Sequence, residues 1–252
     1  MLISYKELDY EQQFHNHFNK IMNHEVQETH SHITKVIVCF VNRSGSNFLC
    51  DQIEKATGYN LGGEYFNPEP VLNNSKDWNA SSLDEYVNKL IESQSRNEGF
   101  VCKMGWHQIL YLKKVGLYDK YFADAKVILL ERKDILEQAV SYYKALQTNQ
   151  WTSNQNADQK EVVFNGEKIR DLVVSISNHY SIFKAFIAVY DVDSMHLFYE
   201  DFCSDKQQFL KSVVDFIGTD FISFVEKSKI EKQYDEVNNR LIEEFKAFAL
   251  EN

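Results

Sequence analysis

Side chains that bind anions directly follow the first strongly apolar stretch of the chain. Residues 36–41 are mostly β-branched, which is typical of a strand buried on both faces, and Arg43-Ser44-Gly45-Ser46 comes next. An arginine fork, two hydroxyls and the N–H groups at the start of a helix all attract phosphate or sulfate oxygens. Gly45 lets the backbone approach such a ligand closely. The pattern predicts an anion site, and the alternative is an ordinary strand-to-helix turn with a capping serine.

This turn differs from the phosphate-binding loop of many ATP-dependent enzymes. That loop has two glycines at a fixed distance and then Lys-Ser/Thr, whose hydroxyl holds magnesium. No Lys-Ser/Thr pair follows Gly45. We therefore expect Arg43 and backbone donors to hold the anion without an obligatory metal.

Two further candidates for chemistry lie beyond the turn. Glu64 follows Gly62-Gly63 among aromatic residues, so it is a candidate functional carboxylate, and a surface carboxylate is an equal alternative. Lys103 lies in the apolar stretch 99–104, where an ammonium group is unfavourable unless it is paired or faces a cleft. The alternative for Lys103 is an amine that reaches solvent along an apolar stem.

A second basic and hydroxyl pair occurs later in the chain. Arg132 follows the apolar stretch 125–130, and Ser141 lies on a helix predicted for 135–148 with Asp134 as its cap. The two side chains are candidates for one ligand group, although a surface ion pair and a solvated hydroxyl are the simpler alternatives. Trp151, in an Asn/Gln-rich segment at 148–160 interpreted as a loop or lid, is a candidate for stacking on a ring.

Alternating strands and helices must position these groups. The pattern predicts four strands, a surface helix at 5–27, an irregular stretch at 71–80, and helices at 48–57, 82–95, 135–148, 166–190, 207–217 and 237–250. The strands are expected at 36–41, 99–104, 125–130 and 195–199. This alternation predicts one α/β domain over 1–252 with a central, mostly parallel sheet flanked by helices, and an N-terminal helical extension at 1–33.

Composition excludes several classes of function. The 252 residues carry a net charge of −10, which disfavours nucleic acids and anionic membranes as partners. The four cysteines show no paired spacing, so we expect neither a disulfide framework nor a zinc site, and a reducing cytoplasm is the expected compartment. Residues 1–9 lack the apolar core of a signal peptide, and no apolar run approaches ~20 residues, so no membrane span is expected.

Taken together, these segments resemble the bacterial trehalose 2-sulfotransferase family, within the wider class that uses 3′-phosphoadenosine 5′-phosphosulfate (PAPS). The matching residues are Arg43-Ser44-Gly45-Ser46, Gly63-Glu64-Tyr65-Phe66, Lys103, Trp106, Arg132, Gln138-Ala139-Val140-Ser141, Gln147-Thr148-Asn149-Gln150-Trp151 and, more weakly, Tyr199-Glu200-Asp201 and Lys232-Gln233-Tyr234-Asp235. Asn47 stands where the family commonly has threonine, and Asn42 where it often has proline or glutamine. The loop between Glu64 and Ser82 does not match clearly, so trehalose itself is weakly supported as the acceptor.

The resemblance implies a P-loop-like sulfotransferase fold, PAPS as donor, adenosine 3′,5′-bisphosphate (PAP) as product and a sugar or other small hydroxyl compound as acceptor. It implies donor-binding roles for Asn42, Arg43, Ser44, Gly45, Ser46, Asn47, Phe48, Arg132 and Ser141, with Arg132 and Ser141 on the 3′-phosphate and Phe48 on the adenine. Glu64 matches the family's base, with Arg43 and Lys103 assisting. Trp106, Gln147 and Trp151 are the expected acceptor contacts.

Two other classes of function remain open at this point. A nucleotide-dependent kinase would use a related strand, loop and helix, but the missing Lys-Ser/Thr argues against it. A non-catalytic protein that binds PAPS or PAP is the other alternative, because the acceptor side is the part that the sequence does not reveal. We expect no metal, and the sequence leaves a homodimer open.

Overall fold

The computed structural model describes residues 9–18, 20–23, 30–151, 161–224 and 235–251. At its centre, four parallel strands form a sheet in the order β2-β1-β3-β4. The strands are β1 (Thr34–Cys39), β2 (Gly99–Met104), β3 (Lys126–Glu131) and β4 (Ser194–Phe198). After β1 the chain adds β2 on one side and later β3 on the other. In such sheets, ligands bind at the carboxyl ends of the strands where this reversal occurs.

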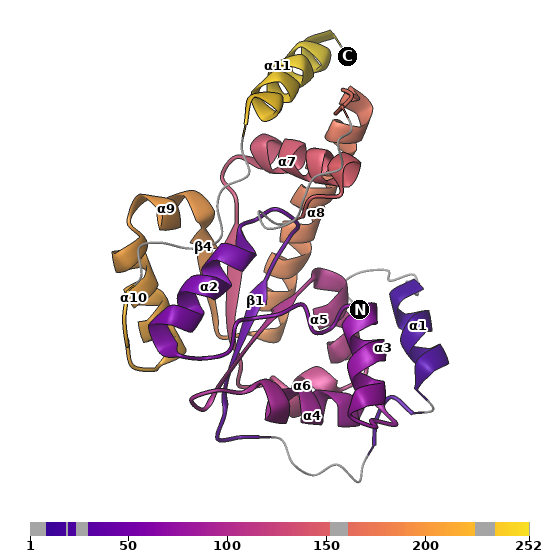
Figure 1. The fold of residues 1–252 in the computed structure, drawn as a ribbon, viewed down its shortest axis with the longest axis vertical. Coiled ribbons are helices and arrows are strands. Elements are labelled where there is room, and N and C mark those ends of the chain that lie inside the picture. The colour runs from indigo at the N-terminus through magenta and orange to yellow at the C-terminus, as the bar shows by residue number, and fades with distance from the viewer. Residues whose placement is uncertain (1–8, 19, 24–29, 152–160, 225–234, 252) are drawn as a thin grey trace.

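One face of the sheet is covered by α2 (Ser46–Thr57), α9 (Tyr199–Ser204) and α10 (Lys206–Ile217), as Figure 1 shows. Val36 and Val38 of β1 point to this face and pack with Leu49 and Ile53 of α2. Side chains alternate along a strand, so Ile37 and Cys39 point to the other face. Both faces are apolar because both are covered.

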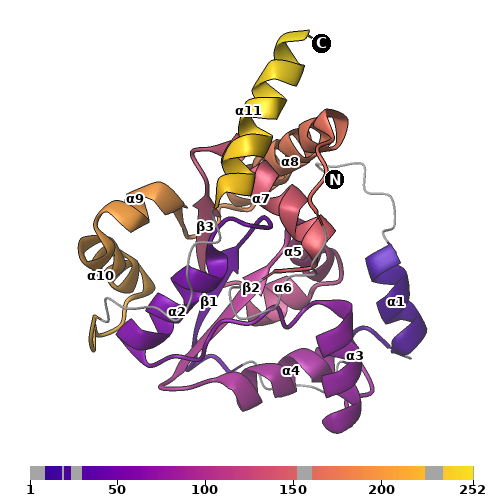
Figure 2. The same ribbon diagram turned by 45° about the horizontal axis from the view of Figure 1, so that its top comes forward.

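The other face carries the larger core. It is covered by α4 (Leu83–Gln94), α5 (Trp106–Lys114), α6 (Leu117–Tyr121) and α8 (Gly166–Tyr190), with α1 (Asp9–His17) and α3 (Pro68–Asp77) outside them (Figure 2). A third, smaller cluster joins α7 (Ile135–Thr148) to α8 and α11 (Glu236–Glu251). In Figure 1, α11 extends from the end of the molecule where α7 lies.

Most predicted elements are confirmed, with ends displaced by one or two residues. The prediction of a single α/β domain with a parallel sheet is correct. Three helices begin where the sequence indicates, because the side chains of Ser82, Asp134 and Asn165 accept hydrogen bonds from the backbone N–H groups three residues later.

Two local predictions are wrong. Residues 71–80 are mostly helical: α3 begins at Pro68, whose fixed φ and missing N–H suit a first turn, and it buries Val71 and Ser75. The helix expected at 5–27 spans only Asp9–His17 within the described residues, and residues 18 and 20–23 lie outside it. Residues 5–8, 19 and 24–27 of that helix, and positions 152–160 of the expected lid, lie outside the described part of the chain.

Helix α8 corrects the expectation about apolar runs. Within the described residues it is the one helix long and apolar enough to cross a membrane by composition. It packs against α5 and α7, and its Tyr180, Phe183 and Phe186 side chains lie in the core. The domain thus buries part of its apolar surface, and one such helix is weak evidence for a membrane span.

Candidate active site

The turn after β1 has the backbone that its glycine requires. Arg43 has a φ of +66° and Gly45 a φ of +93°, both in the left-handed region, and α2 begins directly after Gly45. A side chain at position 45 would overlap the ring of Tyr199. The turn therefore aims the first N–H groups of α2 at the carboxyl edge of the sheet.

Ser44 has a buried hydroxyl that is available for a further hydrogen bond. Its side chain is fully buried, and its hydroxyl has no hydrogen-bond partner in the part of the chain that the structure describes. Buried polar groups are usually paired, so this hydroxyl is suited to bond a ligand oxygen. The residues of the turn thus fit an anionic group, as the sequence predicts.

Glu64 and Lys103 meet at the same edge of the sheet. The ammonium group of Lys103 lies 2.9 Å from Glu64 Oε1 and also donates to the side-chain oxygen of Asn47, which belongs to the first turn of α2. The Lys103 side chain is 6% exposed and that of Glu64 36% exposed. The backbone also joins the two segments, since Lys103 N–H donates to the Gly63 carbonyl at 2.8 Å.

Two amide side chains extend this contact. Asn67 Nδ2 donates to Glu64 Oε2 at 2.8 Å, and Gln108 Nε2 donates to Asn67 Oδ1 at 2.8 Å. Gln108 Oε1 accepts from the Gly105 N–H at 2.8 Å, which fixes the amide at the start of α5. We call Glu64, Asn67, Lys103 and Gln108 the carboxylate cluster. Asn67 and Gln108 were not identified from the sequence.

Arg43 connects the turn to α7. Its Nε donates to Ser141 Oγ at 3.0 Å, and its Nη1 donates to the Trp151 carbonyl at 2.6 Å. Burial, and then the positive charge of Arg132, lower the pKa of Arg43. The second effect requires the two guanidinium groups to be close, so the early turn and the later arginine–serine pair converge as the sequence predicts.

Arg132 is buried between two carboxylates and an aromatic ring. Its Nε donates to Glu200 Oε1 at 2.6 Å, its Nη2 lies 3.0 Å from Glu137 Oε1, and its guanidinium lies 4.6 Å from the Tyr199 ring centre. The Nη2 contact is an ion pair, but Nη2 has no aligned hydrogen-bond acceptor among the described residues. We call Arg43, Arg132 and Ser141, with Glu137 and Glu200, the arginine cluster.

These contacts shift the pKa values of Arg132 and Glu200, the two partners of the main ion pair. Burial opposes the charge of Arg132, but Glu200 and Glu137 outweigh it and raise the pKa. Burial likewise opposes ionisation of Glu200, yet hydrogen bonds from the Lys133 N–H and from Arg132 lower its pKa. The charge of Arg132 is therefore fixed and already compensated within the protein. Glu137 was not anticipated as its partner.

The other predicted contacts surround these clusters. The Asn42 carbonyl accepts from Gln138 Nε2 at 2.8 Å, and Phe48 packs against Phe202 with ring centres 5.1 Å apart. Trp106 begins α5, and the Trp151 indole donates to Asn149 Oδ1 at 3.2 Å. Both amide atoms of Gln147 bond the backbone of Val163, at 3.0 and 3.1 Å. In this structure Gln147 thus holds a neighbouring segment of the chain.

No metal centre accompanies the site in the described residues. No group of three or more His, Cys, Asp and Glu side chains there is arranged to hold an ion. The described cysteines are free: Cys39, Cys50 and Cys102 are buried, and Cys203 is exposed.

Comparison with known proteins agrees with the fold. The chain is similar to a sulfotransferase from Alicyclobacillus acidocaldarius, with a TM-score of 0.52 and 15% identity over 85% of this chain and 92% of that one. It is also similar to mouse sulfotransferase SULT7A1, solved in complex with PAP, with a TM-score of 0.50 and 14% identity. That match covers 84% of this chain and 66% of the mouse chain. At these identities the likeness shows the fold. No curated protein matches the chain.

A family model gives the assignment. The model of the Stf0 sulphotransferase family matches residues 113–248, more than half of the chain. The matched region contains Arg132 and Ser141, while the turn at Arg43 and the Glu64 loop precede it. The trehalose-specific member of the family is not singled out by these matches. The chain belongs to the Stf0 sulphotransferase family.

Proposed function

We propose that this protein transfers the sulfuryl group of PAPS to a hydroxyl group of a small acceptor, with Glu64 as general base. The observation that carries the proposal is the position of Lys103, which bonds both Glu64 and Asn47. One ammonium group therefore links the candidate base to the anion-binding turn. Membership of the Stf0 sulphotransferase family supports sulfuryl transfer as the reaction.

The donor would lie along the arginine cluster. We propose that Arg43, Ser44 and the first N–H groups of α2 hold the 5′-phosphosulfate, and that Arg132 and Ser141 hold the 3′-phosphate. The unpartnered hydroxyl of Ser44 supports this assignment, because it has a hydrogen bond left to give. Phe48 is the proposed adenine contact. The PAP bound to the mouse relative supports the choice of nucleotide.

The chemical step then uses the carboxylate cluster. Glu64 takes the proton of the acceptor hydroxyl while its oxygen forms a bond to sulfur. The bond from sulfur to the bridging phosphate oxygen breaks, and its electron pair stays on PAP. Arg43 and Lys103 neutralise the charge that develops on that oxygen. A positioned base contributes about 10²–10⁴-fold to such reactions.

We propose a sugar as the acceptor, with Trp106 and Trp151 as aromatic contacts, and the cytoplasm as the compartment. Three buried free cysteines are compatible with a reducing environment. A homodimer stays a prediction.

The deciding experiment measures transfer of labelled sulfate from PAPS to a panel of sugars and simple alcohols, with EDTA present. We expect transfer to at least one hydroxyl compound and no loss of activity with the chelator. A parallel titration compares PAP with Mg-ATP. Binding of Mg-ATP without PAP would favour the kinase alternative, and PAP binding without transfer to any acceptor would favour a non-catalytic binding protein.

A further inference from the structure

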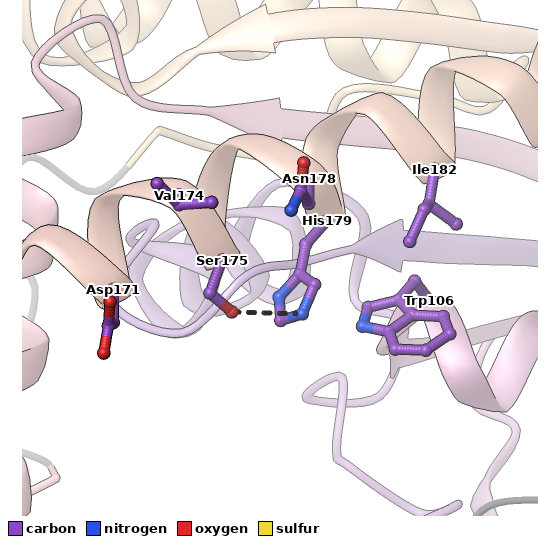
Figure 3. A pocket seen from close by; sticks show the side chains of 7 residues that line it. All are labelled: Trp106, Asp171, Val174, Ser175, Asn178, His179 and Ile182. Carbon is purple, nitrogen blue, oxygen red and sulfur yellow. Dashed lines mark hydrogen bonds between the residues drawn. The ribbon is translucent and has the colours of Figure 1, made fainter. Parts of the chain in front are cut away.

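A pocket of about 400 Å³ lies between the start of α5 and one face of α8. Figure 3 shows Trp106 on one side and the side chains of α8 on the other. The α8 residues recur at steps of three and four, so they form one continuous stripe. They are Asp171, Val174, Ser175, Asn178, His179 and Ile182. Of these seven residues, Trp106 alone is an acceptor contact expected from the sequence.

Each wall of this pocket is tied by hydrogen bonds to one part of the candidate active site. Trp106 lies two residues before Gln108, whose amide leads through Asn67 to Glu64. On the other wall, Tyr180 follows His179 and donates to Gln138 Oε1 at 3.0 Å, and Gln138 Nε2 donates to the Asn42 carbonyl. The pocket is therefore held in a fixed relation to both the candidate base and the anion-binding turn.

The lining combines an aromatic ring with short polar groups. The rings of Trp106 and His179 lie 5.5 Å apart with an interplanar angle of 37°, and His179 Nε2 lies 3.4 Å from Ser175 Oγ. Burial lowers the pKa of His179, so its imidazole is neutral at pH 7. Among the described residues that line the pocket, Asp171 alone carries a formal charge at that pH. Hydroxyl, amide, imidazole and carboxylate groups beside an indole suit a neutral compound rich in hydroxyls.

We propose that this pocket binds the part of a carbohydrate acceptor that lies away from the reacting hydroxyl. The indole of Trp106 covers one apolar face of a sugar ring, and Ser175, Asn178 and Asp171 bond its hydroxyls. The assignment of this ligand as an acceptor rests on the proposed function, whereas the binding of a sugar here does not. An anionic acceptor is disfavoured, because Asp171 would repel it.

Two matched substitutions on α8 test the proposal. Ser175→Leu fills the pocket, and Ser181→Leu makes the same change at an exposed position of the same helix outside the lining. The probes are maltose, trehalose and cellobiose, and their binding is followed by saturation-transfer NMR without PAPS. We expect at least one disaccharide to bind, with a dissociation constant raised at least tenfold by Ser175→Leu and changed less than twofold by Ser181→Leu.

The outcomes separate the pocket from the reaction. If no disaccharide binds, or if both substitutions weaken binding equally, the pocket proposal is wrong. If sulfuryl transfer occurs but Ser175→Leu leaves the KM of the acceptor unchanged, the pocket proposal is again wrong while the proposed function stands. If a disaccharide binds with the expected dependence on Ser175 and no transfer occurs, the pocket is correct and the proposed function fails.

Discussion

The carboxylate cluster and the arginine cluster lie at the same edge of the sheet but are built differently. In the carboxylate cluster, Lys103 and Glu64 face each other on backbone segments that are themselves hydrogen-bonded. In the arginine cluster, Arg43 bonds a backbone carbonyl and Arg132 bonds carboxylates, so both cations already have partners within the protein. We infer that the first cluster is assembled before any ligand arrives, whereas a bound phosphate must exchange some contacts of the second.

The largest effect should come from the carboxylate cluster. Glu64→Gln keeps the shape of the side chain but removes its capacity to take a proton, so turnover should fall about 10²–10⁴-fold. Steady-state kinetics of sulfate transfer measures this, and PAP titration should show unchanged nucleotide affinity. Glu69→Gln, at an exposed position on α3, is the control. Unchanged turnover in Glu64→Gln would remove this residue from the chemistry.

A substitution in the arginine cluster should change the affinity for the nucleotide. Arg132→Ala should weaken PAP binding at least tenfold and change AMP binding less than threefold, because AMP lacks the 3′-phosphate. Calorimetric titration of both nucleotides gives the ratio. Lys133→Ala, which removes an exposed ion pair with Asp201, should affect neither. Equal losses for PAP and AMP in Arg132→Ala would reject the 3′-phosphate role.

Substitution of the two amide side chains of the carboxylate cluster should lower kcat by different amounts. Asn67→Leu removes the donor to Glu64, and a hydrogen bond to a charged group contributes roughly 1.5–3 kcal/mol, so kcat should fall about tenfold with little change in the acceptor KM. Gln108→Leu acts one bond further away and should reduce kcat less. A larger loss in Gln108→Leu than in Asn67→Leu would show that the amides act through the fold of α5 instead.

The last prediction concerns the stability of the fold at acid pH. It depends on His107, which precedes Gln108 of the carboxylate cluster. Burial, with a smaller contribution from His179, lowers the pKa of His107 to about 4. Between its ordinary pKa of 6.5 and 4, the unfolded chain binds a proton that the folded chain does not, so the free energy of unfolding falls as the pH falls. The loss attributable to this group is on the order of 3 kcal/mol.

Urea unfolding at pH 7 and pH 4 measures that loss. His107→Leu should show a shallower dependence on pH than the natural chain, and His15→Leu, at an exposed position on α1, should not. An identical pH dependence in the natural chain and His107→Leu would contradict the lowered pKa.

The fold was largely predictable because its signals are local. Short apolar runs predict the four strands, and Ser82, Asp134 and Asn165 predict three helix starts. Helix α3 was missed because its Asn-Asn-Ser stretch has low helix propensity, and its stability depends on burying Val71 against distant residues. Helix α5 was not predicted at all, and Gly105 before it offers no side chain as a cap.

Several of the predicted site residues that the structure brings together lie at strand ends. Arg43, Lys103 and Arg132 each follow or end a strand, and parallel strands bring such positions to one edge. Asn67 and Gln108 lie 41 positions apart in the chain, so no local pattern reveals their contact. The contact made by Gln147 could not be predicted either. In the sequence, an amide that bonds the Val163 backbone cannot be distinguished from an amide that faces a ligand.

The single bridge between Gly63 and Cys102 has a consequence for how this family can diversify. The chain leaves the sheet after Gly63, forms α3 and α4, and returns to the same place as β2. Because the bridge closes this excursion at its base, we expect insertions or deletions far from its two ends to leave the spacing of Glu64 and Lys103 unchanged. Sequence changes on that detour can therefore accumulate without moving either side chain.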